Sequence, residues 1–320
     1  CRAIDEREES HAGTMITFVN KIAEAIESEY PDKFIHTFAY QYTRKAPKYV
    51  KPAKNVIVRL CTIECCFSHP LETCNVEAIK KGVESKTTFM DDLREWSEIC
   101  DNLFIWDYAT NFANYLMPFP NLHVLQPNLQ LYRKYGVKGV MIQGNFSHGG
   151  GGVMAELEAY VQAKLLWNPD IDVKNVINEF LVGYFGQASV PISRYLDMMH
   201  EAVRPYHMSI YDMPDAPYFT EELLSRAEDL FDEAERLAND DEVLERIMNL
   251  RLQVTYTILS RMPLENSLRE AMIDRFSQEL KRHGITELFE RRNLQMSVDK
   301  MKTSRYSCDR TGLYRVDYRM

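Results

Sequence analysis

The sequence lacks a long apolar run and an excess of positive charge. A spanning helix needs about 20 mostly apolar residues, and no such run occurs in the 320 residues, so we expect no membrane span. The net charge of −9 repels phosphate backbones, so nucleic acid is not an expected partner. Glycine and proline are also few, at 13 each. The remaining composition is that of an ordinary globular protein with one large domain or two medium ones.

The chain begins at Cys1 without the charged and apolar regions of a signal peptide. We therefore expect that such a peptide is absent or was removed, and that the chain is a fragment of a longer protein. Cysteines number seven, an odd count, and four of them fall between positions 61 and 74. They are too few and too clustered for a disulfide scaffold.

Strand-like and helix-like segments alternate over the first half of the chain. Four apolar segments predict strands, at 33–40, 55–64, 102–109 and 137–145, and helical periodicity is found at 14–29, 87–100, 124–135 and 153–166. This alternation favours a parallel sheet with covering helices, that is, an α/β fold. A (β/α)8 barrel of the TIM type needs eight strands. We therefore predict the C-terminal half of such a barrel over residues 1–168, with the N-terminal half missing.

From about residue 170 the pattern changes to amphipathic helices. One apolar stripe of leucine, alanine and phenylalanine side chains runs through 223–237. We predict an α-helical C-terminal domain over 169–291. The last stretch, 292–320, is polar and lacks periodicity, so we predict an irregular tail there.

Each predicted strand ends in polar or aromatic residues, as expected for a barrel whose active site lies at the carboxyl ends of its strands. These clusters are Tyr40-Gln41-Tyr42, Glu64, Trp106-Asp107-Tyr108 and Gln143-Gly144-Asn145. A doubly wound fold would concentrate such groups at one switch point instead. The sequence therefore predicts that these side chains converge on a common pocket.

Several phrases of the first 210 residues together resemble one known family. They are AYQYTRKAPK (39–48), VIVRLCTIECCFSHPL (56–71), NLFIWDYATNFANYLMPFPN (102–121), VLQPN (124–128), GVKGVMIQGNFSHGGGG (136–152) and LLWNPDIDVKNVINEFLVGYFG (165–186). The sequence is similar to a bacterial family first labelled a domain of unknown function, which includes endo-β-N-acetylglucosaminidases acting on N-glycans. That family is distantly similar to α-glucuronidases and β-hexosaminidases.

The resemblance implies a retaining glycoside hydrolase with the barrel fold, secreted, periplasmic or at the cell surface of a bacterium. The implied substrate is a glycan that contains N-acetylglucosamine or a related sugar. One position departs from the family pattern, because this chain has Ile142 where the pattern has a Glu before Gln-Gly-Asn. The departure favours an alternative, a catalytically inactive carbohydrate-binding relative.

Two carboxylates are the candidate catalytic residues. Glycoside hydrolysis needs an acid for the leaving oxygen and a group that stabilises the oxocarbenium ion. Glu64 ends an apolar strand, where burial would raise its pKa toward that of a general acid. Asp107 lies between two aromatic residues, as in many sugar sites. The alternative for Glu64 is an ion pair with an Arg at the barrel top, and for Asp107 it is a capping role.

The other strand-end residues are candidate substrate contacts. Amide side chains suit hydroxyl or acetamido groups, aromatic side chains suit the apolar face of a pyranose, and His148 stands beside a glycine run. The predicted substrate-binding residues are Tyr40, Tyr42, Trp106, Tyr108, Gln143, Asn145 and His148.

A cysteine and histidine cluster offers a third reading, a zinc-stabilised structural domain. Its members are Cys61, Cys65, Cys66, His69 and Cys74. Structural zinc sites use four such ligands at short spacings, but C-x3-C-C-x2-H is not a standard zinc pattern. Buried thiols, or one Cys65–Cys74 or Cys66–Cys74 disulfide, are favoured over zinc. We therefore predict no metal site and no cofactor.

Overall fold

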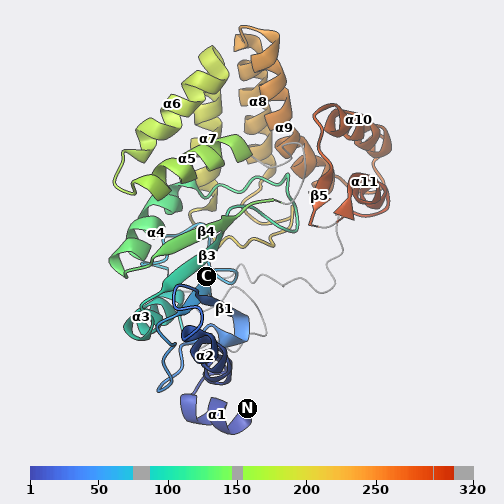
Figure 1. The fold of residues 1–320 in the computed structure, drawn as a ribbon. Helices are drawn as coiled ribbons and strands as arrows, with labels where there is room; N and C mark the ends of the chain where they lie inside the picture. The colour runs from blue at the N-terminus through green and yellow to red at the C-terminus, as the bar shows by residue number, and fades with distance from the viewer. Residues whose placement is uncertain (75–86, 146–153, 291, 306–320) are drawn as a thin grey trace. The chain divides into compact units, whose positions relative to one another are not determined.

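The computed structural model describes residues 1–74, 87–145, 154–290 and 292–305 (Figure 1). Contacts divide the chain into two compact units. Unit 1 consists of Cys1–Tyr108 and Pro127–Gln143, and unit 2 of Ala109–Gln126 and Gly144–Met320. The sequence predicts a single boundary at residue 168, after the fourth strand and its helix. The units instead divide at three points, between residues 108 and 109, 126 and 127, and 143 and 144.

Unit 1 is built on a four-stranded parallel sheet in the order β1-β2-β3-β4. The strands are β1 (Ile35–Ala39), β2 (Val56–Cys61), β3 (Leu103–Tyr108) and β4 (Gly139–Gln143). Helices α2 (Ala12–Glu27) and α3 (Phe89–Ile99) alternate with them, and α1 (Arg2–Glu8) precedes them. Helix α4 (Leu122–Lys134) lies between β3 and β4 in sequence, and its part from Pro127 onward belongs to unit 1. All four predicted strands are confirmed, and so is the α/β class.

The two faces of this sheet differ in their surroundings. Alternation along each strand sends successive side chains to opposite faces. On one face Val58, Leu60, Leu103 and Ile105 are fully or almost fully buried, and α2 contacts β1 and β2. On the other face Phe38, Arg59, Phe104 and Trp106 are exposed or half-buried, whereas Ile57, Cys61 and Tyr108 are buried. The sheet therefore has one covered face and one accessible face.

Local capping fixes where several helices begin. Thr88 and Asp91 form a capping box at the start of α3. In unit 2 the side chains of Asp172, Thr220 and Asp240 accept hydrogen bonds from first-turn N–H groups. Such caps satisfy donors that the helix itself leaves without a partner. They explain why the helix starts were predictable from sequence.

A buried glutamate holds the loop after β1 in unit 1. The carboxylate of Glu8, which is fully buried, accepts hydrogen bonds from the backbone N–H groups of Tyr49 and Val50 at 2.7 and 2.9 Å. Burial by itself raises the pKa of Glu8, but these hydrogen bonds and Arg7 outweigh it, and the pKa is lowered. The proline-containing loop at 43–54 is thus held by a residue of the first helix.

Unit 2 is mainly helical. Its helices are α5 (Ala155–Trp167), α6 (Val173–Phe185), α7 (Ser189–Val203), α8 (Glu221–Leu237), α9 (Asp241–Arg261), α10 (Arg269–Arg282) and α11 (Leu294–Thr303). Leu224, Ala227, Phe231 and Ala234 bury the predicted stripe of α8, which packs between α7 and α9. Two short strands, β5 (Glu287–Phe289) and β6 (Arg292–Asn293), pair antiparallel.

The stretch predicted as an irregular tail contains a helix. Residues 294–303 form α11, which buries Leu294, Val298 and Met301. The sequence-based prediction was wrong here because a helix of ten residues with only three buried apolar positions gives little periodic signal. Residues 306–320 lie outside the described part of the chain.

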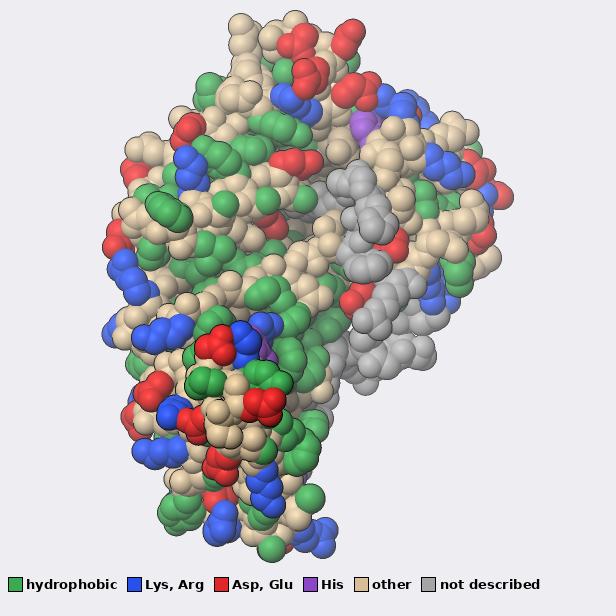
Figure 2. All heavy atoms as spheres, in the orientation of Figure 1, with side chains coloured by type: hydrophobic (Ala, Val, Ile, Leu, Met, Phe, Trp, Pro, Cys, Tyr) green, Lys and Arg blue, Asp and Glu red, His purple; other side chains and the backbone are tan. Residues whose placement is uncertain are grey.

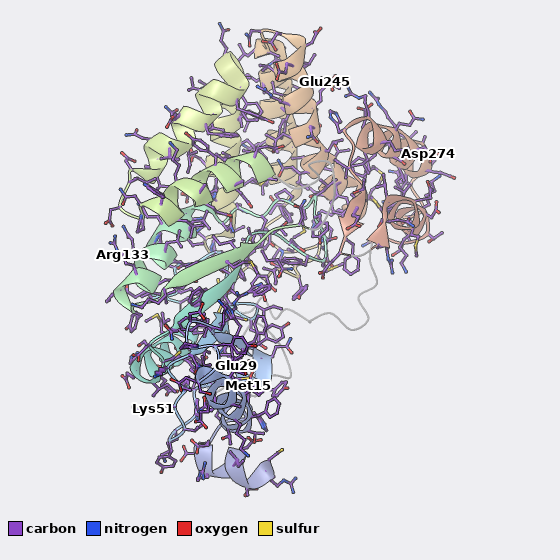
Figure 3. All side chains as sticks on the ribbon, in the orientation of Figure 1. Met15, Glu29, Lys51, Arg133, Glu245 and Asp274 are labelled. Atoms are coloured by element: carbon purple, nitrogen blue, oxygen red, sulfur yellow. The ribbon has the colours of Figure 1, made fainter. Side chains whose placement is uncertain are left out.

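Unit 2 has exposed ion pairs on its surface. Asp274 of α10 pairs with Lys302 of α11, and Glu245 of α9 pairs with Arg282 of α10, each at 2.5 Å; both acids are labelled in Figure 3. Solvent-exposed pairs of this kind contribute about 0–1 kcal/mol each. They contribute less to the stability of the unit than its buried apolar stripe does.

The segment between β3 and α4 is anchored by asparagines. The side-chain amides of Asn111 and Asn114 donate to the carbonyl of Asp212 at 2.8 and 2.9 Å, and the hydroxyl of Tyr256 donates to Asn114 Oδ1 at 2.5 Å. All of these groups are buried within unit 2. The two asparagines in the segment NLFIWDYATNFANYLMPFPN therefore have a structural role, which is to hold this segment against the rest of unit 2.

Candidate functional site

The accessible face of the sheet carries a group of aromatic and polar side chains, which we call the aromatic face. It is defined by Phe38, Arg59, Phe104, Trp106 and Gln143. The strand register explains why they share a face, since Phe38 pairs with Arg59, Arg59 with Phe104, and Trp106 lies two residues beyond Phe104. Gln143 lies at the end of β4, two residues past the partner of Trp106.

Trp106 is at the centre of the aromatic face. Its ring lies 5.2 Å from the ring of Phe38, measured between centroids and at a tilt of 58°. The Trp106 indole N–H donates to Gln143 Oε1 at 2.9 Å. This bond fixes the indole plane and leaves the amide nitrogen of Gln143, with its two N–H donors, oriented away from the indole. An oriented ring beside an oriented amide is an arrangement suited to a sugar with an acetamido group.

Arg59 adds positive charge to the same face. Its guanidinium lies 5.6 Å from the Trp106 ring centroid, in cation–π range. Its Nε is buried and has no hydrogen-bond partner among the described residues. His36 lies nearby, and both burial and the charge of Arg59 lower its pKa. The face therefore presents a cation with a donor still available, together with a neutral imidazole.

Asp107 points away from the aromatic face. Its carboxylate accepts hydrogen bonds from the hydroxyls of Thr62 and Tyr132 at 2.6 and 3.1 Å, and from the N–H of Tyr108 at 2.9 Å. Tyr132 belongs to α4, so Asp107 lies on the covered face. Burial raises the pKa of Asp107, and the three hydrogen bonds partly counteract the shift. Trp106 and Asp107 are neighbours in sequence but are not brought together.

Glu64 belongs to a buried ionic cluster. Its Oε2 lies 3.3 Å from Nη1 of Arg44, while Nε of the same arginine lies 2.6 Å from Oδ2 of Asp92. The three side chains are at most 2 % exposed. Burial raises the pKa of Asp92, although Arg44 opposes this. The contacts of Glu64 match the ion-pair alternative stated for it from sequence.

The structure separates the other predicted contacts. The Tyr40 hydroxyl accepts from the Gln41 side chain at 3.2 Å, and Tyr42 is 72 % exposed with its ring 5.8 Å from His11. Tyr108 is buried. Asn145 belongs to unit 2 and is half-buried, and His148 lies outside the described residues. Of the predicted contacts, Trp106 and Gln143 are brought together, and Tyr108 pairs with Gln143 in the register of β3 and β4.

Sequence reasoning missed Arg44, Thr62 and Tyr132 as partners of the two candidate carboxylates. Arg44 lies in a segment predicted as a loop, and Tyr132 lies in a helix 25 residues from Asp107. It also missed Phe38 and Arg59 on the aromatic face. Strand alternation was the available signal. Within its own strand each of Phe38, Arg59 and Trp106 directly follows a residue whose side chain points to the opposite, covered face.

Ile142 lies on the same side of the sheet as Asp107. The two residues are paired in the register of β3 and β4, and Gln143 follows on the opposite side. Replacement of a glutamate by Ile142 therefore leaves the composition of the aromatic face unchanged. It places an apolar side chain beside Asp107, where a second buried carboxylate would be costly.

The six cysteines that the structure describes form no disulfide, so of the alternatives stated from sequence the structure has thiols and neither the Cys65–Cys74 nor the Cys66–Cys74 pairing. Cys61 and Cys65 are buried thiols. Burial raises the pKa of Cys61 to about 12 and that of Cys65 well above its usual range. These two thiols stay protonated at neutral pH, which makes them poor nucleophiles and poor metal ligands.

On the face shown in Figure 2, basic and acidic side chains are interspersed. No helix within the described ranges has both the length and the hydrophobicity to cross a membrane.

The fold and site together define a mixed α/β protein whose parallel sheet presents an aromatic and polar face. The chain belongs to the family described as a domain of unknown function, DUF4838, whose family model matches residues 1–197. The matched region contains the whole sheet and the helices as far as α7. Among curated proteins no match was found.

Proposed function

We propose that the aromatic face binds a glycan containing N-acetylglucosamine and that the chain is part of a glycoside hydrolase. The observation that carries the proposal is the hydrogen bond from Trp106 to Gln143, which fixes an indole ring beside an amide. The apolar face of a pyranose stacks on such a ring. The Gln143 amide can bond the acetamido group, and the Arg59 guanidinium adds positive charge beside the Trp106 ring.

The proposal extends to the fold. The strands follow one another in the order β1-β2-β3-β4 without the reversal of a doubly wound sheet. A sheet wound in one direction keeps its helices on one face, as in a (β/α)8 barrel, whose other face lines the interior. In this proposal the sheet is half of a TIM-type barrel, and the aromatic face is the side that faces the barrel interior.

Substitution of Trp106 by alanine is expected to weaken glycan binding about tenfold or more, because stacking and ring orientation are lost together (about 1.4 kcal/mol per factor of ten). Isothermal titration of the chain with an N-glycan core oligosaccharide measures this. Trp106→Phe retains a ring and should lose less. Trp167→Ala is the matched control, since that indole is 92 % exposed on α5. Equal affinities for Trp106→Ala and the wild type would refute the proposed site.

Glu64 remains a predicted general acid, and Asp107 remains a predicted catalytic carboxylate. Substitution of Glu64 tests whether the protein hydrolyses a glycan. A general acid contributes about 10²-fold or more to the rate. In the full-length protein, Glu64→Gln is therefore expected to lower kcat for release of reducing sugar by at least that factor. Unfolding measured in parallel separates this from damage to the buried cluster. Undiminished kcat in a folded variant would remove Glu64 from the mechanism.

A glycan-binding protein without turnover is the second candidate. It is favoured by the contacts of Glu64 with Arg44 and of Asp107 with Thr62, and by Ile142. It predicts glycan affinity by calorimetry with no release of reducing sugar at any pH. In that case Trp106→Ala loses affinity, while Glu64→Gln changes stability alone.

A further inference from the structure

The loop after β2 brings two cysteines and a histidine of unit 1 together. Cys66 Sγ lies 3.2 Å from His69 Nδ1. One potential ligand atom each from Cys66, His69 and Cys74 lies within 4.8 Å of the others. We propose that these three side chains bind a zinc ion.

Zinc fits the chemistry and the spacing of the three side chains. Thiolate and imidazole are its preferred ligands, with Zn–S near 2.3 Å and Zn–N near 2.0–2.1 Å. Two ligand atoms on a tetrahedral ion are then about 3.5–3.8 Å apart. The 3.2 Å between Cys66 Sγ and His69 Nδ1 is slightly shorter than these values, and all three ligand atoms lie within 4.8 Å of one another. Side-chain movements of up to about one ångström therefore suffice to reach the tetrahedral distances. Three ligands leave one position of the tetrahedron for a further ligand or water.

The backbone holds the loop in the shape that the site needs. The N–H groups of Thr73 and Cys74 both donate to the carbonyl of Pro70, at 3.1 and 3.0 Å, and this turn brings Cys74 back toward Cys66. The Leu71 N–H donates to Asn128 Oδ1 at 2.9 Å, which fixes the loop to α4. Loop closure therefore costs little additional conformational entropy when the metal binds.

A hydroxyl supports the first ligand. Ser68 Oγ lies 3.2 Å from Cys66 Sγ, and a hydroxyl that donates to a coordinating sulfur stabilises the thiolate form. The other two cysteines of the sequence cluster are directed elsewhere. Cys61 Sγ lies 3.6 Å from the carbonyl of Arg59, and Cys65 is buried beside the ionic cluster. The site thus follows the pattern C-x2-H-x4-C.

Metal content of the whole chain tests the proposal. The chain, purified with reductant and equilibrated with zinc, is expected to retain about one zinc per molecule after gel filtration. Cys66→Ser, Cys74→Ser and His69→Ala should each lose it. Cys1→Ser and His11→Ala are matched controls, because Cys1 and His11 are exposed and outside the cluster, and both should keep the metal.

Cobalt substitution of the wild type provides a readout that needs no variant to fold. A thiolate-to-cobalt charge-transfer band in the near ultraviolet is expected, and His69→Cys should keep the metal with a stronger band. A chain that retains no metal overturns the proposal, as does a Cys66–Cys74 disulfide found by mass spectrometry. Equal zinc content in the wild type and all three ligand variants would also overturn it. None of these readouts involves glycan, so the result is independent of the proposed function.

Discussion

Arg44→Met is expected to destabilise unit 1 by about 3–5 kcal/mol at pH 7, as removal of one partner from a buried ionic cluster does. Arg44 contacts the carboxylates of Glu64 and Asp92, and its Nη2 also donates to the Thr87 carbonyl at 3.0 Å. Methionine keeps most of the apolar stem but leaves two carboxylates buried without a cation. Chemical denaturation of both proteins measures the difference.

The loss caused by Arg44→Met should grow with pH. Burial already raises the pKa of Asp92 in the folded protein, and removal of the Arg44 charge raises it further. The folded variant then binds protons more tightly than the unfolded chain, so its stability falls as pH rises from the unfolded-state pKa through the folded-state pKa. Unfolding at pH 5 and at pH 8 is expected to show the smaller loss at pH 5.

Two further variants serve as comparisons for the stability of Arg44→Met. Arg94→Met removes a neighbouring exposed pair with Asp91 and should change stability by about 0–1 kcal/mol. The triple variant Arg44→Met, Glu64→Gln, Asp92→Asn removes the buried charges together and should recover part of the loss. A stability of Arg44→Met close to that of the wild type at both pH values would show that Glu64 and Asp92 do not depend on Arg44.

The second large effect is expected at Arg269 in unit 2. This side chain is 2 % exposed. Its Nη1 donates to the carbonyls of Leu259 and Met262, and its Nη2 to those of Met301 and Ser304. It therefore ties the end of α9 to the end of α11. Each buried carbonyl left without a donor costs about 1–3 kcal/mol.

Arg269→Met is accordingly expected to destabilise unit 2 by about 3 kcal/mol or more. It should also expose α11 to limited proteolysis before the rest of the unit unfolds, because the connection to α9 is lost. Arg275→Met is the control, since Arg275 lies on the same helix but is exposed. Similar cleavage of the two variants would show that Arg269 does not hold α11 in place.

The sequence by itself determined where the strands and most helices lie. Continuous apolar runs such as NVIVRLCTIE can be buried only as interior strands, and residues such as Asp172 and Thr220 cap helix starts through local geometry. These signals depend on a few neighbouring residues, so they can be recognised in the sequence without any knowledge of the fold. The helix α11 was not predicted because its three buried apolar positions give little periodic signal.

The tertiary structure alone decided which strand-end residues meet. Trp106 and Asp107 are adjacent in sequence, yet alternation along β3 sends them to opposite faces, one toward Gln143 and the other toward Tyr132. Glu64 meets Arg44 across 20 residues, and a turn at Pro70 brings Cys74 toward Cys66. Long-range pairing follows from packing the whole unit, and local sequence does not encode it.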